Sequence, residues 1–226
     1  MKSKSAQSLQ PPELPKRLQT AAIDALEDHA EHIGLSIIAG NFAQQTAKNV
    51  HFEQIHFQRT IFTQARLTQV RVLHVRFEAC DLSAANWERA RLQRVHFAGC
   101  RLLGAQFFQA QVESVLFKDC NLESGLFAQA AFRSTRFEQC VLRNVSFEGA
   151  NLAGVIFDRC DLTGSDLRSA QLSGTDFRGS TLNGLQVGSE ELRGAVIDPL
   201  QVIQVAGLLG ITVKEAGEAL DIDTDH

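Results

Sequence analysis

The sequence predicts an all-β solenoid, a quadrilateral β-helix of five-residue repeats, and two periods in the sequence carry this prediction. A bulky apolar residue recurs at every fifth position from Phe52 to Ile197, without an insertion or deletion, through thirty consecutive repeats. A second period of twenty is superimposed on the first, because the cysteines recur at that interval: Cys80, Cys100, Cys120, Cys140 and Cys160. Four pentapeptides therefore complete one coil, and the pattern restarts one layer along the axis.

Two positions of each repeat are expected to face inward: the bulky position and the position two residues before it, called here the small position. The small position holds small or β-branched residues such as Val50, Ile55 and Thr60, and the cysteines also occupy it. Two inward side chains separated by one outward residue are typical of a strand. Coils stacked about 4.8 Å apart would bury these residues in one continuous core. We expect a filled shaft with reduced thiols, so any activity should lie on the outer faces or at the ends.

The residues before the regular repeats are expected to form a cap. Residues 1–11 are predicted to be disordered, and residues 12–49 to be an N-terminal helix and capping segment. The helix is expected from Pro12 to about Ile33, ended by Gly34, because apolar residues share one helical face. These residues are Leu14, Leu18, Ala22, Leu26 and Ala30. The helix would cover the open first coil, and the regular β-helix, residues 50–197, would begin near Val50.

The last coil is expected to be irregular. Leu185 and Glu190 occupy small positions. Because an unpaired carboxylate is costly to bury, we expect a distortion between Gly184 and Gly194.

A C-terminal helical dimerisation segment is predicted over residues 198–220, followed by a disordered tail, residues 221–226. Asp198 suits the N-cap, Pro199 the first helical position, and Gln201 a capping box. The helix should stop at Gly210. Its apolar residues cover more than one face, so one side would cover the last coil and another would form a two-fold dimer interface. The expected interface residues are Leu200, Ile203, Ala206, Leu208, Leu209 and Ile211.

Charge is distributed unevenly, although the formal net charge is only −4. Residues 50–115 carry eight Arg or Lys against five Asp or Glu, residues 116–197 eight against ten, and residues 198–226 one against six. The acidic half is either an ordinary solvated surface, in which Asp and Asn favour one position of the repeat, or an anionic surface that competes for a nucleic-acid groove on a partner. The candidate partner-binding residues are Glu148, Asp158, Asp161, Asp166 and Asp176.

Other classes of function have little support in the sequence. There is no secretory signal and no apolar run long enough to cross a membrane, so we expect a cytoplasmic protein. The histidines do not join a nucleophile or a metal-binding spacing, and there is no phosphate-binding loop. We therefore expect no catalytic residues, no cofactor, no metal and no small-molecule substrate. The arginines of the basic half have no surface aromatic residues among them, which argues against direct nucleic-acid binding.

The repeats resemble the pentapeptide repeat family, whose pattern is A(D/N)Lxx, in the segments AANWE, GANLA, GTDFR and CDLTG. The resemblance implies a right-handed coil. The ending IDPLQVIQVAGLLGITV is similar to the C-terminal dimerisation segment of the MfpA and Qnr topoisomerase-protecting proteins. This second resemblance implies a dimeric rod that imitates DNA, binds DNA gyrase or topoisomerase IV, and protects it from quinolones or natural topoisomerase poisons. The unbroken register leaves no room for the projecting loops of Qnr, so the chain is closer to MfpA. A scaffold that binds a different protein remains the alternative.

Overall fold

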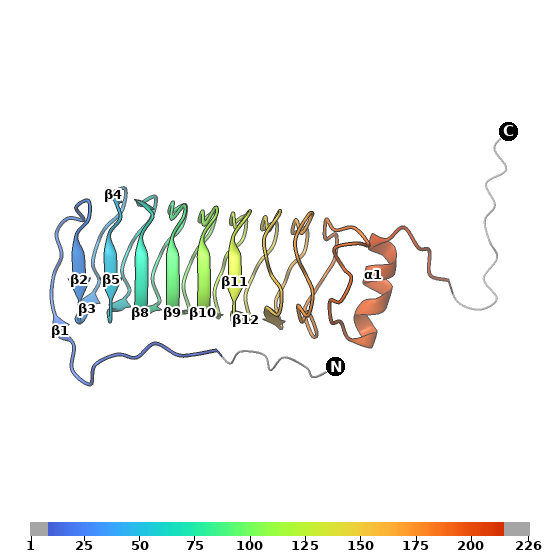
Figure 1. Ribbon diagram of the computed structural model, residues 1–226, viewed down its shortest axis with the longest axis horizontal. Coiled ribbons are helices and arrows are strands. Elements are labelled where there is room, and N and C mark those ends of the chain that lie inside the picture. The colour runs from blue at the N-terminus through green and yellow to red at the C-terminus, as the bar shows by residue number, and fades with distance from the viewer. Residues whose placement is uncertain (1–8, 215–226) are drawn as a thin grey trace.

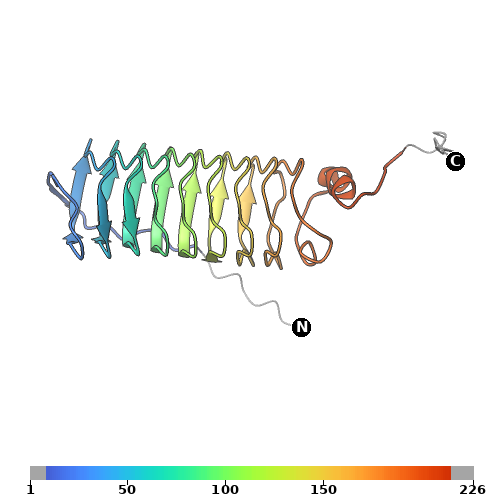
Figure 2. The same ribbon diagram turned by 90° about the horizontal axis from the view of Figure 1, so that it is seen from above.

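The computed structural model describes residues 9–214 and shows a parallel β-solenoid with a short helix at its C-terminal end (Figures 1 and 2). The strands are β1 Gln19–Thr20, β2 Glu31–Ile33, β3 Leu35–Ile38, β4 Thr46–Lys48, β5 His51–Glu53, β6 His56–Gln58, β7 Arg66–Thr68, β8 Arg71–Glu78, β9 Arg91–Ala98, β10 Gln111–Lys118, β11 Ala131–Arg133, β12 Arg136–Glu138 and β13 Ile156–Asp158. A 3₁₀ turn, η1 (Pro199–Gln201), leads into helix α1 (Val202–Leu208). The expected disorder of residues 1–8 and 221–226 lies outside the described residues.

The register confirms the period of twenty. Strands β8, β9 and β10 pair in parallel, with Arg71 opposite Arg91 and Arg91 opposite Gln111. Beyond β13 the same offset continues as single bridges, the last of which joins Asp176 to Val196. Each coil therefore stacks on the one before it, as the sequence pattern predicts.

The bulky positions fill the shaft, which confirms their inward assignment. One column consists of phenylalanines stacked face to face: the ring centroids of Phe77 and Phe97 are 4.7 Å apart, and those of Phe97 and Phe117 are 4.8 Å apart. Phe117 and Trp87 are fully buried. The ring separation matches the spacing between strands, so the rings and the backbone stack with the same repeat.

The residues at the small positions also form a regular column, which is held by side-chain hydrogen bonds to the backbone. Each cysteine is buried and free, and its thiol donates to backbone carbonyls, as Cys100 does to Phe77 and to Ala98, both at 3.5 Å. The hydroxyl of Thr135 makes the equivalent bonds to Val112 and Arg133. The thiol of Cys120, more than burial, raises the pKa of Cys100 to about 12. At this position cysteine acts as a small donor like serine or threonine, and Cys100 remains a protonated thiol at neutral pH.

The N-terminal helix predicted within residues 12–49 is wrong. The described part of this segment is extended, and strands β2 and β3 pair with β5 and β6 in the register of twenty. The coil therefore begins well before Val50, with Ile37 and Phe42 buried in the core. Gly34 has φ +70°, which is a left-handed conformation. Gln54 and other residues two places after a bulky position adopt the same conformation. Gly34 therefore lies at a corner of the coil and does not end a helix. Backbone pairing at the open sheet edge outweighs the local helical pattern.

The expected irregularity of the last coil is confirmed. Leu185 remains buried, but Glu190 is exposed and pairs with Arg193 at 3.1 Å. Residues 189–194 form turns, and the register returns at Val196, which bridges to Asp176. The carboxylate thus stays in solvent while the chain bulges around it.

Helix α1 closes the C-terminal end as predicted. The side chain of Asp198 accepts from the amides of Leu200 and Gln201, and the side chain of Gln201 accepts from the amide of Asp198, which completes the capping box. The other end of the Gln201 amide is buried and donates to the carbonyls of Phe177 and Ser180 at 2.7 and 2.6 Å. Gly210, with φ +73°, follows the end of the helix. Residues 215–220 of the predicted C-terminal segment lie outside the described range.

Candidate interaction surface

The five candidate acidic residues lie on three sides of the shaft, not on one. Asp158 and Asp176 are neighbours on the side that contains β13, because Ile156 bridges to Asp176. Asp161 bridges to Val141 and Thr181 on the next side. Asp166 lies on a third side, where Glu148 belongs to the preceding coil. The structure therefore groups four of the candidates as two pairs, leaves Asp161 alone on its side, and does not assemble one acidic face.

The aspartates that precede a bulky residue have a structural role. The Oδ1 atoms of Asp161, Asp166 and Asp176 accept from the backbone N–H two residues ahead at 3.0–3.1 Å. Asn121 and Asn151 make the same bond. The side chain satisfies an amide at the turn, as in an Asx turn. The Asp or Asn of the repeat pattern is thus explained by the turn alone, without a functional demand for charge.

Arginines neutralise four of the five candidates. Arg168 pairs with Asp166 at 2.6 Å and Arg178 with Asp176 at 2.7 Å, each from two residues further along the chain. These guanidinium groups hold the pKa of Asp166 and the pKa of Asp176 below their ordinary values. Arg136 pairs with Asp158 at 2.8 Å and lowers the pKa of that carboxyl in the same way.

The remaining two candidates differ from each other. Asp161 accepts from Arg143 and from the hydroxyl of Thr163. Glu148 is exposed and makes no ion pair within the described residues. The hydrogen bond and charge of Asp166 raise the pKa of Arg168, and the charge of Glu148 adds to this effect. The outward arginines are more exposed than the aspartates they bind, so the surface shows both signs of charge and is less anionic than the sequence suggests.

Most of the predicted dimer residues form an exposed apolar face at the C-terminal end. Leu200 is 87% exposed, Ile203 65% and Leu209 40%, and Ile211 beyond the helix is also exposed. Ala206 is half-buried. Leu208 packs against the core of the shaft and so belongs to the face that covers the last coil. The end of the rod therefore presents several large apolar side chains to solvent, which is unusual for a surface without a partner.

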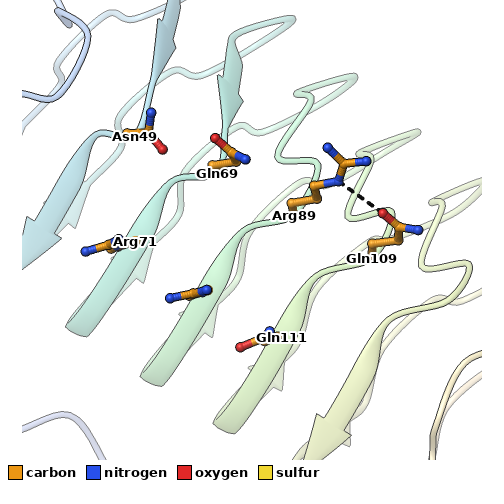
Figure 3. A pocket seen from close by; sticks show the side chains of 7 residues that line it. Asn49, Gln69, Arg71, Arg89, Gln109 and Gln111 are labelled. Carbon is orange, nitrogen blue, oxygen red and sulfur yellow. Dashed lines mark hydrogen bonds between the residues drawn. The ribbon is translucent and has the colours of Figure 1, made fainter.

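Sequence reasoning missed a basic groove along one edge of the shaft, where each coil turns from one side to the next. The groove has a volume of about 340 Å³ and is lined by Arg71, Arg89 and Arg91 together with Asn and Gln side chains. Figure 3 shows Gln69, Arg89 and Gln109 on successive turns beside Arg71 and Gln111 on the strands. The sequence does contain a signal for this groove, because Asn, Gln and Arg recur at intervals of twenty at outward positions near the corners. These are Asn49, Gln69, Arg89 and Gln109, and Arg71, Arg91 and Gln111.

The structure gives little support for other kinds of site. Within residues 9–214 no group of three or more His, Cys, Asp or Glu side chains is placed to hold a metal ion. The same residues contain no helix that is long and apolar enough to span a membrane. A filled shaft whose outer faces carry ordered polar ladders is the structure of a repeat scaffold, a class of protein that binds its partners on the surface of a stacked solenoid.

The chain belongs to the pentapeptide repeat family. The model of the pentapeptide repeat region matches residues 33–107, 71–135 and 110–187. A trypsin-treated form of QnrB1, a plasmid-mediated fluoroquinolone resistance protein, has a similar structure: 19% identity, a TM-score of 0.50, and coverage of 86% of this chain and 99% of that one. HetL, a pentapeptide repeat protein involved in heterocyst differentiation regulation in the cyanobacterium Nostoc, is 17% identical over 75% of this chain and 90% of that one, with a TM-score of 0.32. No curated protein matches the sequence.

Proposed function

We propose that this protein binds a type II topoisomerase, DNA gyrase or topoisomerase IV, and protects the enzyme from topoisomerase poisons. The observation that carries the proposal is a filled shaft that ends in a capped helix with an exposed apolar face. The similarity of the ending IDPLQVIQVAGLLGITV to the dimerisation segment of the MfpA and Qnr proteins supports the same role. A protein that acts on these enzymes works in the cytoplasm, beside the chromosome.

Two copies of the chain would form the active rod. Association through Leu200, Ile203 and Leu209 would remove large apolar side chains from water, and it is favoured by about 25 cal/mol for each Å² buried. A two-fold contact at this end joins two shafts end to end and roughly doubles the length available to a partner.

The dimer is tested by substituting the exposed face and leaving the face that covers the last coil intact. Ile203→Asp should convert a dimer into a monomer in sedimentation equilibrium, with an unchanged circular dichroism spectrum, because Ile203 is exposed in the single chain. Leu103→Asp is the matched control, since Leu103 is an exposed leucine in the middle of the shaft. A variant Ile203→Asp that remains dimeric, or a wild-type chain that is monomeric, contradicts this interface.

The shape of the rod, more than its charge, supports the imitation of DNA. Four of the five candidate carboxylates already bind arginine, so a basic groove on an enzyme would have to displace a guanidinium group from each of them. Exposed ion pairs contribute only about 0–1 kcal/mol each, so displacing each arginine costs no more than this amount of binding free energy. The carboxylates then serve to orient the rod, while the smooth shaft provides the fit.

A gyrase supercoiling assay tests the function. The wild-type protein should restore supercoiling in the presence of a quinolone or inhibit it in the absence of the drug. Neither effect at micromolar protein would reject the topoisomerase role and favour a scaffold for a different protein partner. The double variant Asp166→Asn/Asp176→Asn keeps the turn hydrogen bonds and removes two charges, because asparagine makes the same bond at Asn121. Unchanged protection by this variant identifies shape as the main determinant, and lost protection identifies charge.

A further inference from the structure

The basic groove is a regular structure that the parallel register creates. Arg71 begins β8, Arg91 begins β9 and Gln111 begins β10, and the register places the three residues opposite one another on adjacent coils. The corner residues of the preceding side, among them Arg89 and Gln109, form the other wall (Figure 3). A partner in this groove would run along the axis of the shaft, crossing one coil about every 4.8 Å.

The groove concentrates positive charge that the described residues leave unbalanced. Arg71 and Arg91 are exposed and occur in no ion pair within residues 9–214. Arg89 is only loosely paired, with its Nε atom 3.6 Å from Glu88. In contrast, each arginine between residues 136 and 193 binds a carboxylate: Arg136, Arg143, Arg159, Arg168, Arg178 and Arg193. Like charges on neighbouring strands repel, so the groove gains stability when an anion enters it.

The amide side chains in the groove favour a peptide over a nucleic acid. Arg89 donates to Gln109, and Gln109 donates to Gln129 on the next coil, at 3.0 and 2.9 Å. A carboxamide offers both donors and an acceptor, which match the C=O and N–H groups of an extended peptide. A nucleic-acid strand would present mainly acceptors along its backbone and would need aromatic side chains for base stacking. The groove lining contains arginines and amides and no aromatic side chain.

The chain itself shows that this part of the shaft can hold a carboxylate of an extended segment. Residues 9–18, just before β1, run along the outside of the coils (Figure 1). Glu13 pairs with Arg94 at 2.7 Å, and the backbone N–H of Glu13 donates to Nδ1 of His74 at 2.9 Å. Arg94 belongs to β9, the strand that begins with Arg91. One carboxylate of an extended chain is therefore already held on an arginine of this strand, together with a backbone hydrogen bond.

We propose that the basic groove binds an extended acidic segment of another protein, with its carboxylates on Arg71 and Arg91 and its backbone on the amides of the opposite wall. Alternate side chains of an extended segment lie about 6.6 Å apart on one face, within reach of arginines on adjacent coils. This surface lies in the N-terminal half of the shaft and does not depend on the proposed topoisomerase role.

Fluorescence anisotropy with a defined probe tests the proposal on the full chain. The probe is a fluorescein-labelled decapeptide of alternating glutamate and serine, and a decapeptide of alternating lysine and serine is its counterpart. The acidic peptide should bind saturably at low salt, and Arg71→Gln/Arg91→Gln should weaken it by about tenfold or more, as expected for the loss of two charge-assisted pairs. The control Arg143→Gln/Arg168→Gln removes two arginines outside the groove and should leave the affinity unchanged.

Three results would overturn the proposal. The first is the absence of saturable binding by the acidic peptide, and the second is equal binding by wild type and Arg71→Gln/Arg91→Gln when both have the same melting temperature. The third is tighter binding of a labelled ten-residue oligothymidylate that the same double variant abolishes, which would assign the groove to nucleic acid.

Discussion

The two ends of the shaft are closed in different ways. At the C-terminal end, a capped helix docks one buried glutamine on the carbonyls of the last coil and leaves an apolar face exposed. At the N-terminal end, an extended segment adds backbone to the open sheet edge, with β1 paired to β3, and is then held on the outside by Glu13. The first closure uses a local sequence signal, and the second uses hydrogen bonds that any extended chain can make.

The two ends can be compared with the central core, where a substitution should cause the largest loss of stability. Phe117→Ala should lower the free energy of unfolding by about 3–5 kcal/mol, because the ring is fully buried between two stacked phenylalanines. Urea unfolding measures the loss, and Leu116→Ala, at the adjacent outward position, is the control. A free energy of unfolding in urea for Phe117→Ala equal to that of wild type would refute the inward column.

The C-terminal closure should be the next most sensitive. Gln201→Ala removes the amide that bonds the carbonyls of Phe177 and Ser180, and it should cost about 1–3 kcal/mol because buried acceptors lose their partners. Hydrogen exchange in the last coil should rise as well. Gln204→Ala removes one 3.2 Å bond to the amide of Leu182 and should cost less. Equal losses for the two variants would mean that the helix is held by its apolar contacts alone.

Acid should weaken the C-terminal half through its aspartate–arginine pairs. The arginines lower the pKa of Asp166 and of Asp176 in the folded state, so the stability from these pairs is present above the ordinary carboxyl pKa of about 3.9 and is lost as the pH falls through the lowered values. The melting temperature should decline below about pH 4. Asp166→Asn/Asp176→Asn should flatten that decline, and a curve parallel to that of wild type would show that the pairs contribute nothing.

The N-terminal closure should show the smallest effect on global stability. Glu13→Gln breaks an exposed ion pair and should change the free energy of unfolding by less than about 1 kcal/mol. Local release should still be visible as faster trypsin cleavage after Arg17, which lies between Glu13 and β1. Glu113→Gln, which breaks the pair with Arg133 elsewhere on the shaft, is the control. Equal cleavage rates for the two variants would show that Glu13 does not hold the segment.

Much of this fold could be predicted from the sequence because the same packing of inward residues repeats in every coil. The bulky and small positions, the coil of twenty residues and the C-terminal cap are all local or periodic signals, and each is present in the structure. The sequence does not reveal the N-terminal coils because His32 and Ala47 stand where bulky apolar residues are expected. His32 nevertheless stacks on Phe52, with ring centroids 5.6 Å apart. The hydrogen bonds of these coils are made with residues about twenty positions away, which a local helical pattern does not reveal.

The candidate site was less predictable than the fold. The sequence indicates which residues are outward, but it does not show that Arg168 and Arg178 fold back onto Asp166 and Asp176. Net charge therefore overstated the anionic character of the C-terminal half. The basic groove was missed for the complementary reason: Arg71 and Arg91 are twenty residues apart in the sequence, and only stacking of the coils makes them neighbours.

The fixed offset of twenty residues between coils restricts how the length of the shaft can change. Removal or duplication of twenty residues, for instance the coil from Cys100 to Asp119, joins a corner to an equivalent corner and keeps the cysteine and phenylalanine columns continuous. A change of five, ten or fifteen residues would keep the bulky positions inward but would break the columns of like residues, and a length that is not a multiple of five would set inward side chains of one coil against outward side chains of the next. Gene duplication that preserves these columns therefore lengthens the molecule in steps of one coil, about 4.8 Å each, while the chemistry of its two ends stays constant.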